Sequence, residues 1–271
     1  MSDFLKRFLS SILILVLVVC VLSVKVEFFN IIIGAVVFLL SREWFGLIIK
    51  KEESNYHLYV SLFAAATTIF YGFFIYCDYD WIIYLSLFFW LFAFASMCFY
   101  VYEPKPDVSW GFTNHIIQGV FVIVPTGVAL TILRGFGVEF LIQLFVWVWS
   151  TDVGAYIFGK QFGKNKFIPE ISPNKTVEGF FGGILTVVLA TIVMYYSMEL
   201  DSYSLLEYII VGIIISLFAI LGDAYESMVK RRLGAKDSGS IIPGHGGVLD
   251  RLDSLTTAAP VLAILIFFMP S

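Results

Sequence analysis

Long apolar runs, separated by short polar connections, follow one another along almost the whole chain. An α-helix needs about 20 predominantly apolar residues to cross the roughly 30 Å hydrocarbon core of a bilayer. The pattern therefore predicts an all-α, polytopic integral membrane protein with about nine transmembrane helices. The predicted spans are residues 8–24, 28–49, 58–77, 81–102, 112–133, 138–158, 177–198, 205–221 and 255–269.

The first two runs carry charges that affect their interpretation. Two basic residues precede the first run, as in a secretory signal peptide, but no small-x-small cleavage site follows Val24. We therefore interpret the first run as an uncleaved membrane helix. Arg42 and Glu43 interrupt the second run, and we expect that helix to end near Leu40.

The composition agrees with a chain whose solvent is lipid. Hydrophobic residues make up 59% and charged residues 14%, with a mean hydropathy of +0.90, whereas a soluble domain has about 25% charged residues. Cys20, Cys77 and Cys98 form no Cys-x-x-Cys pair, so we interpret them as small buried hydrophobic residues. Basic residues form no continuous stripe, so we expect no binding of nucleic acid.

The basic residues fall almost entirely on one side of the predicted membrane. In membrane proteins, Lys and Arg collect in the cytoplasmic connections. With the amino terminus in the cytoplasm, all but Lys25 and Arg134 of the 17 basic residues lie on that side. A missed or added helix in the middle of the chain would scramble this distribution. It therefore supports both the number of helices and a cytoplasmic amino terminus.

The short connections indicate a single membrane domain over residues 1–271. Polar residues, which are costly at membrane depth and usually functional, gather at the cytoplasmic ends of the later helices. We expect residues 1–140 to be mainly scaffold helices and residues 141–271 to carry the catalytic helices and cytoplasmic loops. A short chain without appended domains suits a bacterial inner membrane, with the active site facing the cytoplasm.

The first polar cluster contains Asp152, inside a predicted span. Both a structural partner on another helix and a role in substrate binding are open for this carboxylate. Gly154 to Lys160 also spells G-x-x-x-x-G-K, the start of a P-loop. We reject that motif because Gln161 stands where Ser or Thr should follow, and because the residues between belong to a membrane helix.

The second cluster, residues 172–179, reads S-P-N-K-T-V-E-G. Pro173 predicts the start of the next helix, with Ser172 as its cap. Asn174 and Lys175 crowd the membrane entrance, and a lysine near a helix amino terminus, where backbone amides favour anions, suits a phosphate. The G-x-x-x-G pattern that begins at the end of this cluster predicts close helix packing.

The third cluster, residues 222–254, is the richest in charge and glycine. If the eighth helix continues past its apolar run, Asp223 and Lys230 share one of its faces. Asp250 and Asp253 lie three residues apart where the last helix begins. The loop between these helices contains five glycines, whose backbone amides can approach phosphate oxygens without obstruction by side chains.

These residue types suit a metal-assisted reaction on phosphates. Asp223 and Asp250 are hard oxygen ligands of the kind that Mg²⁺ uses together with phosphate and water. The lysines and arginines around them can neutralise an anionic substrate. Zinc is not expected, because His245 is the one histidine in a polar motif and no cysteine lies near it.

Residues 227–253 read S-M-V-K-R-R-L-G-A-K-D-S-G-S-I-I-P-G-H-G-G-V-L-D-R-L-D and resemble the signature of the phosphatidate cytidylyltransferases, also called CDP-diacylglycerol synthases. The two earlier clusters resemble the family in content and order. The resemblance implies transfer of the cytidylyl group of CTP to phosphatidic acid, giving CDP-diacylglycerol and pyrophosphate in phospholipid biosynthesis. It also implies dependence on Mg²⁺, with K⁺ as a second cation, an all-helical membrane fold and a homodimer.

Two sets of functional residues follow from the clusters and the resemblance. The predicted catalytic residues are Asp223, Lys236, Asp237, Asp250 and Arg251, with Asp223 and Asp250 as the metal ligands. The predicted substrate-binding residues are Asp152, Asn174, Lys175, Ser227, Lys230, Arg231, Gly244, His245, Gly246, Gly247 and Asp253. Metal binding, cytidine binding and support of the site all stay open for Asp152, Asp237, His245 and Asp253.

The implied reaction needs no strong general base. The attacking phosphate of phosphatidic acid has a second pKa of about 6 and is largely dianionic at neutral pH. The nearest alternative is a CTP-dependent kinase of a polyprenol or dolichol, which would leave CDP and a phosphorylated lipid. A transporter is a further alternative, but the charges gather at helix ends and the two halves show no evident internal repeat.

Overall fold

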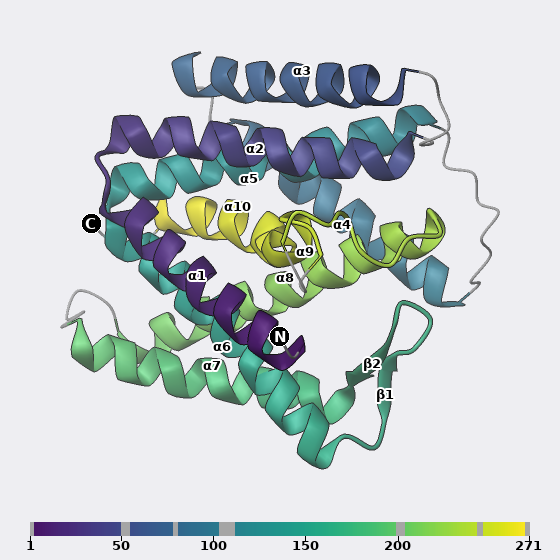
Figure 1. Ribbon diagram of the computed structural model, residues 1–271. Helices are drawn as coiled ribbons and strands as arrows, with labels where there is room; N and C mark the ends of the chain where they lie inside the picture. Colours follow the sequence, from purple (N-terminus) through teal and green to yellow (C-terminus); the bar gives the residue numbers. More distant parts are fainter. Residues whose placement is uncertain are drawn as a thin grey trace.

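The computed structural model describes residues 3–49, 55–77, 81–102, 112–198, 204–242 and 246–268. Within them lie ten helices and one two-stranded antiparallel hairpin (Figure 1). The elements are α1 (Asp3–Ser23), α2 (Val26–Ile48), α3 (Tyr56–Cys77), α4 (Trp81–Tyr102), α5 (Phe112–Phe136), α6 (Val138–Phe162), β1 (Lys166–Ile168), β2 (Ser172–Thr176), α7 (Val177–Ser197), α8 (Leu205–Arg232), α9 (Leu249–Leu252) and α10 (Leu255–Ile266).

Among the described helices, seven are long and apolar enough to cross a membrane, judged by length and composition: α2 to α8. The chain is therefore an all-α polytopic membrane protein, as predicted, with one small hairpin added. The two other predicted spans are shorter apolar helices, Ile12–Ser23 within α1 and Leu255–Ile266. At about 1.5 Å per residue, the 12 residues of α10 extend only about 18 Å.

Helix α10 lies at the centre of the molecule, between the pair α2 and α5 and the pair α6 and α8 (Figure 1). It packs against α4, α5, α6 and α8. Every residue of α10 except Leu265 is buried. A helix that is apolar on all sides is stable in a protein when other helices surround it. Its apolar composition therefore reflects burial among helices.

Helix α2 continues to Ile48, so the prediction that it ends near Leu40 was wrong. The charged pair does not stop the helix, because Glu43 is buried with hydrogen-bond partners inside the protein. The neighbouring Trp44 is also buried, and its indole Nε1 donates to the backbone carbonyl of His115 in α5 at 2.9 Å. Protein contacts thus replace the water that a charge at this position would otherwise need.

The start of α7 also differs from the prediction. Pro173 lies in β2 and does not begin the helix, which starts at Val177. Thr176 is the N-cap: its backbone is extended, and its hydroxyl accepts a hydrogen bond from the N–H of Gly179 at 3.1 Å. Proline fits β2 because each strand of a two-stranded hairpin has one edge without a partner, where no backbone donor is needed.

Helices α6 and α7 pack closely because small residues line their contact. A Cβ atom at Gly154 would lie 2.7 Å from the carbonyl oxygen of Gly182, and one at Gly183 would lie 3.0 Å from that of Thr151. The predicted close packing at the G-x-x-x-G pattern is confirmed. The residues that imitate a P-loop belong to the continuous helix α6, which confirms the rejection of that motif.

The cysteines are not buried inside the protein, so that interpretation was wrong. Cys20 and Cys98 are exposed, and Cys77 is partly exposed. They lie on apolar helices, α1, α4 and α3, among many other exposed large hydrophobic side chains. In a membrane protein such surfaces contact lipid, so an apolar residue there does not need a protein interior.

Candidate active site

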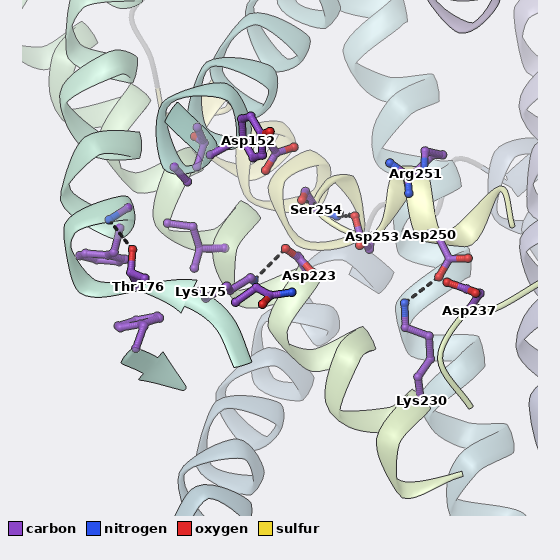
Figure 2. Close-up of a pocket in the computed structure, with 18 residues that line it drawn as sticks. Asp152, Lys175, Thr176, Asp223, Lys230, Asp237, Asp250, Arg251, Asp253 and Ser254 are labelled. Atoms are coloured by element: carbon purple, nitrogen blue, oxygen red, sulfur yellow. Dashed lines mark hydrogen bonds and ion pairs between the residues drawn. The ribbon is translucent and has the colours of Figure 1, made fainter. Parts of the chain in front are cut away.

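The three polar clusters of the sequence meet at a cavity of about 490 Å³ between α6, the hairpin, α7, α8 and α9 (Figure 2). Aspartates from four different parts of the chain line this polar cavity: Asp152, Asp223, Asp237, Asp250 and Asp253. Three basic residues line it as well: Lys175, Lys230 and Arg251. A cavity with both signs of charge at close quarters can bind a polyphosphate and the cation that accompanies it.

Lys175 and Asp223 connect the hairpin to α8. The ammonium of Lys175 lies 2.7 Å from Oδ2 of Asp223, and the two side chains are 26% and 30% exposed. Ser227, one turn further along α8, has its hydroxyl 3.4 Å from Oδ1 of Asp223. Figure 2 shows Lys175 pointing from β2 toward Asp223. Lys175 reaches the cavity because Pro173 and its neighbours form the extended strand β2 and not the first turn of a helix.

Lys230 connects α8 to α9. Its ammonium lies 2.5 Å from Glu226 and 2.6 Å from Oδ1 of Asp250. All three side chains are less than a tenth exposed. Helix α8 continues to Arg232, as the predicted face requires, and both Asp223 and Lys230 of that face line the polar cavity.

Asp250 holds two separate parts of the glycine loop. Its carboxylate accepts hydrogen bonds from the backbone N–H of Ser238 at 2.9 Å and of Gly247 at 2.7 Å, besides the contact with Lys230. Burial alone would raise the pKa of Asp250, but the hydrogen bonds from Lys230, Gly247 and Ser238 hold it below its ordinary value. This carboxylate is therefore ionised at neutral pH.

Gly246 is needed beside Asp250 for two reasons. Its φ is +84°, a left-handed conformation that residues with a Cβ rarely adopt. A Cβ atom at this position would also lie 2.5 Å from Oδ2 of Asp250. The absent side chain thus lets the loop close around the carboxylate.

Asp253 lies where negative charge accumulates. Burial raises the pKa of Asp253 well above its ordinary value, and the carboxylates of Asp223, Glu226 and Asp152 raise it further. The backbone N–H of Ser254 donates to it at 2.7 Å, which offsets only part of this effect. The acidic groups at this end of the cavity therefore repel one another, and a bound cation would relieve the repulsion.

Nine predicted site residues line the polar cavity: Asp152, Asn174, Lys175, Asp223, Lys230, Asp237, Asp250, Arg251 and Asp253. Ser227 and Gly247 adjoin it through the hydrogen bonds to Asp223 and Asp250, and Gly246 packs against Asp250.

Four predicted residues are not part of this arrangement as described. Lys236 and Arg231 are exposed and do not line the cavity, and a guanidinium nitrogen of Arg231 donates to the carbonyl of Ala235 at 3.2 Å. Gly244 and His245 lie outside the described residues. The functional roles of all four stay predictions.

Two features of the site were not predicted from the sequence. One is Glu43 of α2, which reaches the glycine loop from the part of the chain assigned to the scaffold. The charged pair inside the second apolar run was the available signal, because a membrane helix that retains a charge usually retains it for a partner. The other feature is a second, apolar cavity.

The apolar cavity has a volume of about 880 Å³ and lies between α4, the hairpin, α7 and α8. Its lining is almost entirely aliphatic, aromatic and sulfur-containing side chains, among them Trp90, Phe94 and Leu217. Phe167, Phe180 and Ile220 line both this cavity and the polar one. The two cavities are therefore neighbours that share a wall, and no single stretch of sequence contains either.

The acidic residues suit a metal ion that binds together with a nucleotide, but not one that is held by protein side chains alone. Within the described part of the chain, no three Asp, Glu, His or Cys side chains form a group that would hold a metal ion by themselves. Mg²⁺ that binds with a nucleotide needs only one or two carboxylates, because phosphate and water complete its shell. The donor chemistry of the polar cavity fits such an ion, and the partly exposed Asp223 is the more accessible of the two predicted ligands.

Comparison with known proteins identifies the family to which the chain belongs. The sequence profile of the Cytidylyltransferase family matches residues 5–269. The chain belongs to this family. The resemblance seen in residues 227–253 is thereby confirmed and extends to the earlier helices, where hydropathy alone gave no specific signal.

Among the similar proteins are three phosphatidate cytidylyltransferases of staphylococci. Those of Staphylococcus epidermidis, Staphylococcus haemolyticus and Staphylococcus aureus are 50%, 47% and 47% identical to the chain over 133, 136 and 135 residues. The alignments cover 49–50% of this chain and 51–52% of the relatives. The chain thus spans about half the length of the relatives it matches.

Proposed function

We propose that this member of the Cytidylyltransferase family transfers the cytidylyl group of CTP to phosphatidic acid, giving CDP-diacylglycerol and pyrophosphate in phospholipid biosynthesis. The observation that carries the proposal is the shared wall of the two cavities, formed by Phe167, Phe180 and Ile220. One cavity suits a charged nucleotide, and the other suits the chains of a lipid. A lipid phosphate at their junction lies within reach of a nucleotide.

The reaction needs the two anions brought together more than it needs a base. The phosphate of the lipid is largely dianionic at neutral pH, and one of its oxygens attacks the α-phosphorus of CTP. As the new phosphorus–oxygen bond forms, the bond to the β-phosphate oxygen breaks and pyrophosphate leaves. Lys175 and Arg251 line the polar cavity and would offset the negative charge that develops on it.

Asn174 and the backbone amides of the glycine loop would orient the phosphates. Asn174 lines the cavity next to Lys175. Lys236 and Asp237, which border the loop, belong to the proposed catalytic set by family resemblance. Fixing both reactants in a productive geometry is itself a large part of catalysis for such a transfer.

We propose Mg²⁺ as the cofactor, held by Asp223 and Asp250 together with substrate phosphates. Mg²⁺ would screen the phosphate charge and stabilise the leaving pyrophosphate. Each of these carboxylates is paired with a lysine ammonium, Asp223 with Lys175 and Asp250 with Lys230. Direct coordination by Asp250 would require one of its present donors to leave. A second cation such as K⁺ is proposed from family resemblance alone.

Labelled CTP tests this function in purified protein with lipid vesicles. We expect label to enter the lipid extract only with phosphatidic acid and Mg²⁺, with one pyrophosphate released for each lipid product. Release of CDP with phosphorylation of a polyprenol would instead identify a lipid kinase. Substrate uptake into proteoliposomes without turnover of CTP would indicate a transporter.

The membrane setting belongs to the same proposal. We propose about nine spans, a cytoplasmic amino terminus and a polar cavity that faces the cytoplasm of a bacterial inner membrane, which the distribution of basic residues supports. A homodimer is supported by family resemblance only. The lining of the polar cavity begins at Thr151 and supports catalytic helices within residues 141–271, while α4 and Glu43 of α2 show that the earlier helices contribute more than a scaffold. Cysteine labelling from either side of sealed vesicles tests the orientation.

A further inference from the structure

Glu43 is a buried carboxylate far from the three polar clusters in sequence and in direct contact with one of them in space. It lies in α2 and is only 5% exposed. Its oxygens accept hydrogen bonds from the N–H of Val248 at 2.9 Å, the N–H of Leu249 at 2.8 Å and the hydroxyl of Ser238 at 3.0 Å. These three donors belong to the glycine loop and to the start of α9.

Glu43 and Asp250 divide the same short segment between them. Asp250 accepts the N–H of Gly247, and Glu43 accepts the next two, from Val248 and Leu249. Ser238 is shared in the same way, because its N–H donates to Asp250 and its hydroxyl donates to Glu43. Two carboxylates from opposite ends of the chain therefore hold the same two pieces of the loop.

Glu43 supplies hydrogen-bond acceptors that the residues at the start of α9 do not provide themselves. The first N–H groups of a helix have no partner within the helix, and the N-cap residue Val248 has no side chain that could accept from them. Glu43 accepts them instead, as a cap provided from another helix. The glycine loop packs closely on this carboxylate, since a Cβ atom at Gly239 would lie 2.8 Å from Oε1 of Glu43.

We propose that Glu43 is a positioning residue for cytidylyl transfer. It fixes α9 against α2, so that Asp250 and Arg251, which α9 carries, face the polar cavity. The inference rests on the proposed function for its kinetic part. A carboxylate is required, because both oxygens accept hydrogen bonds and an amide has only one oxygen to offer. Helix α2 thereby takes part in building the active site.

Glu43→Gln tests the inference by two measurements on the full-length protein in detergent. Hydrogen–deuterium exchange without substrates should be at least tenfold faster at the amides of Val248 and Leu249. The kcat for labelled CTP should fall about 10- to 100-fold, the cost of a misplaced catalytic group. The KM for phosphatidic acid should be unchanged, because the apolar cavity does not contact Glu43.

Ser238→Ala is the milder companion variant. It removes the hydroxyl that donates to Glu43 and leaves the N–H that donates to Asp250. We expect kcat to fall about fivefold, the equivalent of one hydrogen bond. Should Glu43→Gln fail to insert into the membrane, Ser238→Ala decides, and a wild-type kcat in that variant overturns the inference.

Thr191→Val is the matched control. Thr191 is also buried and polar, but its hydroxyl accepts a hydrogen bond from the indole N–H of Trp147 at 2.9 Å, away from the loop. The Thr191→Val variant should be less stable than the wild type. Its hydrogen–deuterium exchange at Val248 and Leu249 and its kcat should match those of the wild type. Wild-type exchange or wild-type kcat in Glu43→Gln, or an equal loss of kcat in Thr191→Val, overturns the inference. If the wild-type protein does not turn over CTP, the proposed function fails and the exchange measurement still decides whether Glu43 holds the loop.

Discussion

The ammonium of Lys175 lies 2.7 Å from the carboxylate of Asp223, and this ion pair joins strand β2 to helix α8 in the lining of the polar cavity. Both side chains retain more than a quarter of their exposure. Ion pairs that water can reach contribute only about 0–1 kcal/mol to stability. The position of this pair inside a cavity lined with further charges indicates a role in binding and catalysis rather than in folding.

Replacing Lys175 by Met should therefore separate activity from stability. We expect kcat/KM for CTP to fall about 100-fold, because a cation facing the developing negative charge is lost. The melting temperature in detergent should hardly change. Lys164→Met is the matched control, since Lys164 is exposed and does not line the cavity. A normal rate in Lys175→Met would remove this lysine from the site.

Asp250→Ala should abolish formation of the lipid product while the protein still inserts into the membrane. The substitution removes a proposed Mg²⁺ ligand and the acceptor of the Ser238 and Gly247 N–H groups. We expect a loss of about 100-fold or more in kcat, measured with purified, Mg²⁺-supplied protein. Turnover like that of the wild type would contradict both the metal-ligand role and the positioning of the loop.

Asp253→Asn should stabilise the protein in the absence of divalent cations. Burial and the neighbouring carboxylates raise the pKa of Asp253 in the folded state. Its charge therefore destabilises the fold increasingly as pH rises from the unfolded pKa of about 3.9. We expect the variant to melt at a higher temperature than the wild type in EDTA, with a larger difference at pH 8 than at pH 5. A wild type that is the more stable protein at pH 8 would contradict this.

Adding Mg²⁺ extends the same experiment. A cation that relieves the repulsion between Asp253 and Asp223 should raise the melting temperature of the wild type. The asparagine variant has less repulsion to relieve, so its gain should be smaller. Equal gains would place the ion away from Asp253.

Leu217→Trp should interfere with the lipid and not with the nucleotide. Leu217 lines the apolar cavity on α8, and a larger side chain there reduces the space for acyl chains. We expect the KM for phosphatidic acid to rise about tenfold, the equivalent of about 1.4 kcal/mol of lost contact. The KM for CTP should stay constant. Leu206→Trp, on the same helix and outside the cavity lining, should leave both constants unchanged.

The sequence predicted the helices well and their ends less well. Hydropathy located the seven helices α2 to α8, which are long and apolar enough to cross a membrane, because the requirement for about 20 apolar residues is imposed by the membrane and not by the fold. The ends of α2 and α7 were misplaced at Leu40 and Pro173. Both errors came from local rules about charge and proline, which contacts made by Glu43 and by the hairpin overrode.

By itself, the sequence determined the apolar helices and indicated the class of chemistry that we propose. Aspartates, lysines and a glycine-rich loop at helix ends indicate phosphate and metal chemistry wherever they lie, since that follows from charge and donor type. It did not determine which groups meet. Lys175 with Asp223, Lys230 with Asp250 and Glu43 with Leu249 are paired only by the packing of helices from distant parts of the chain. Such pairs depend on distance and burial, so only the tertiary structure revealed that α2 helps to build the site.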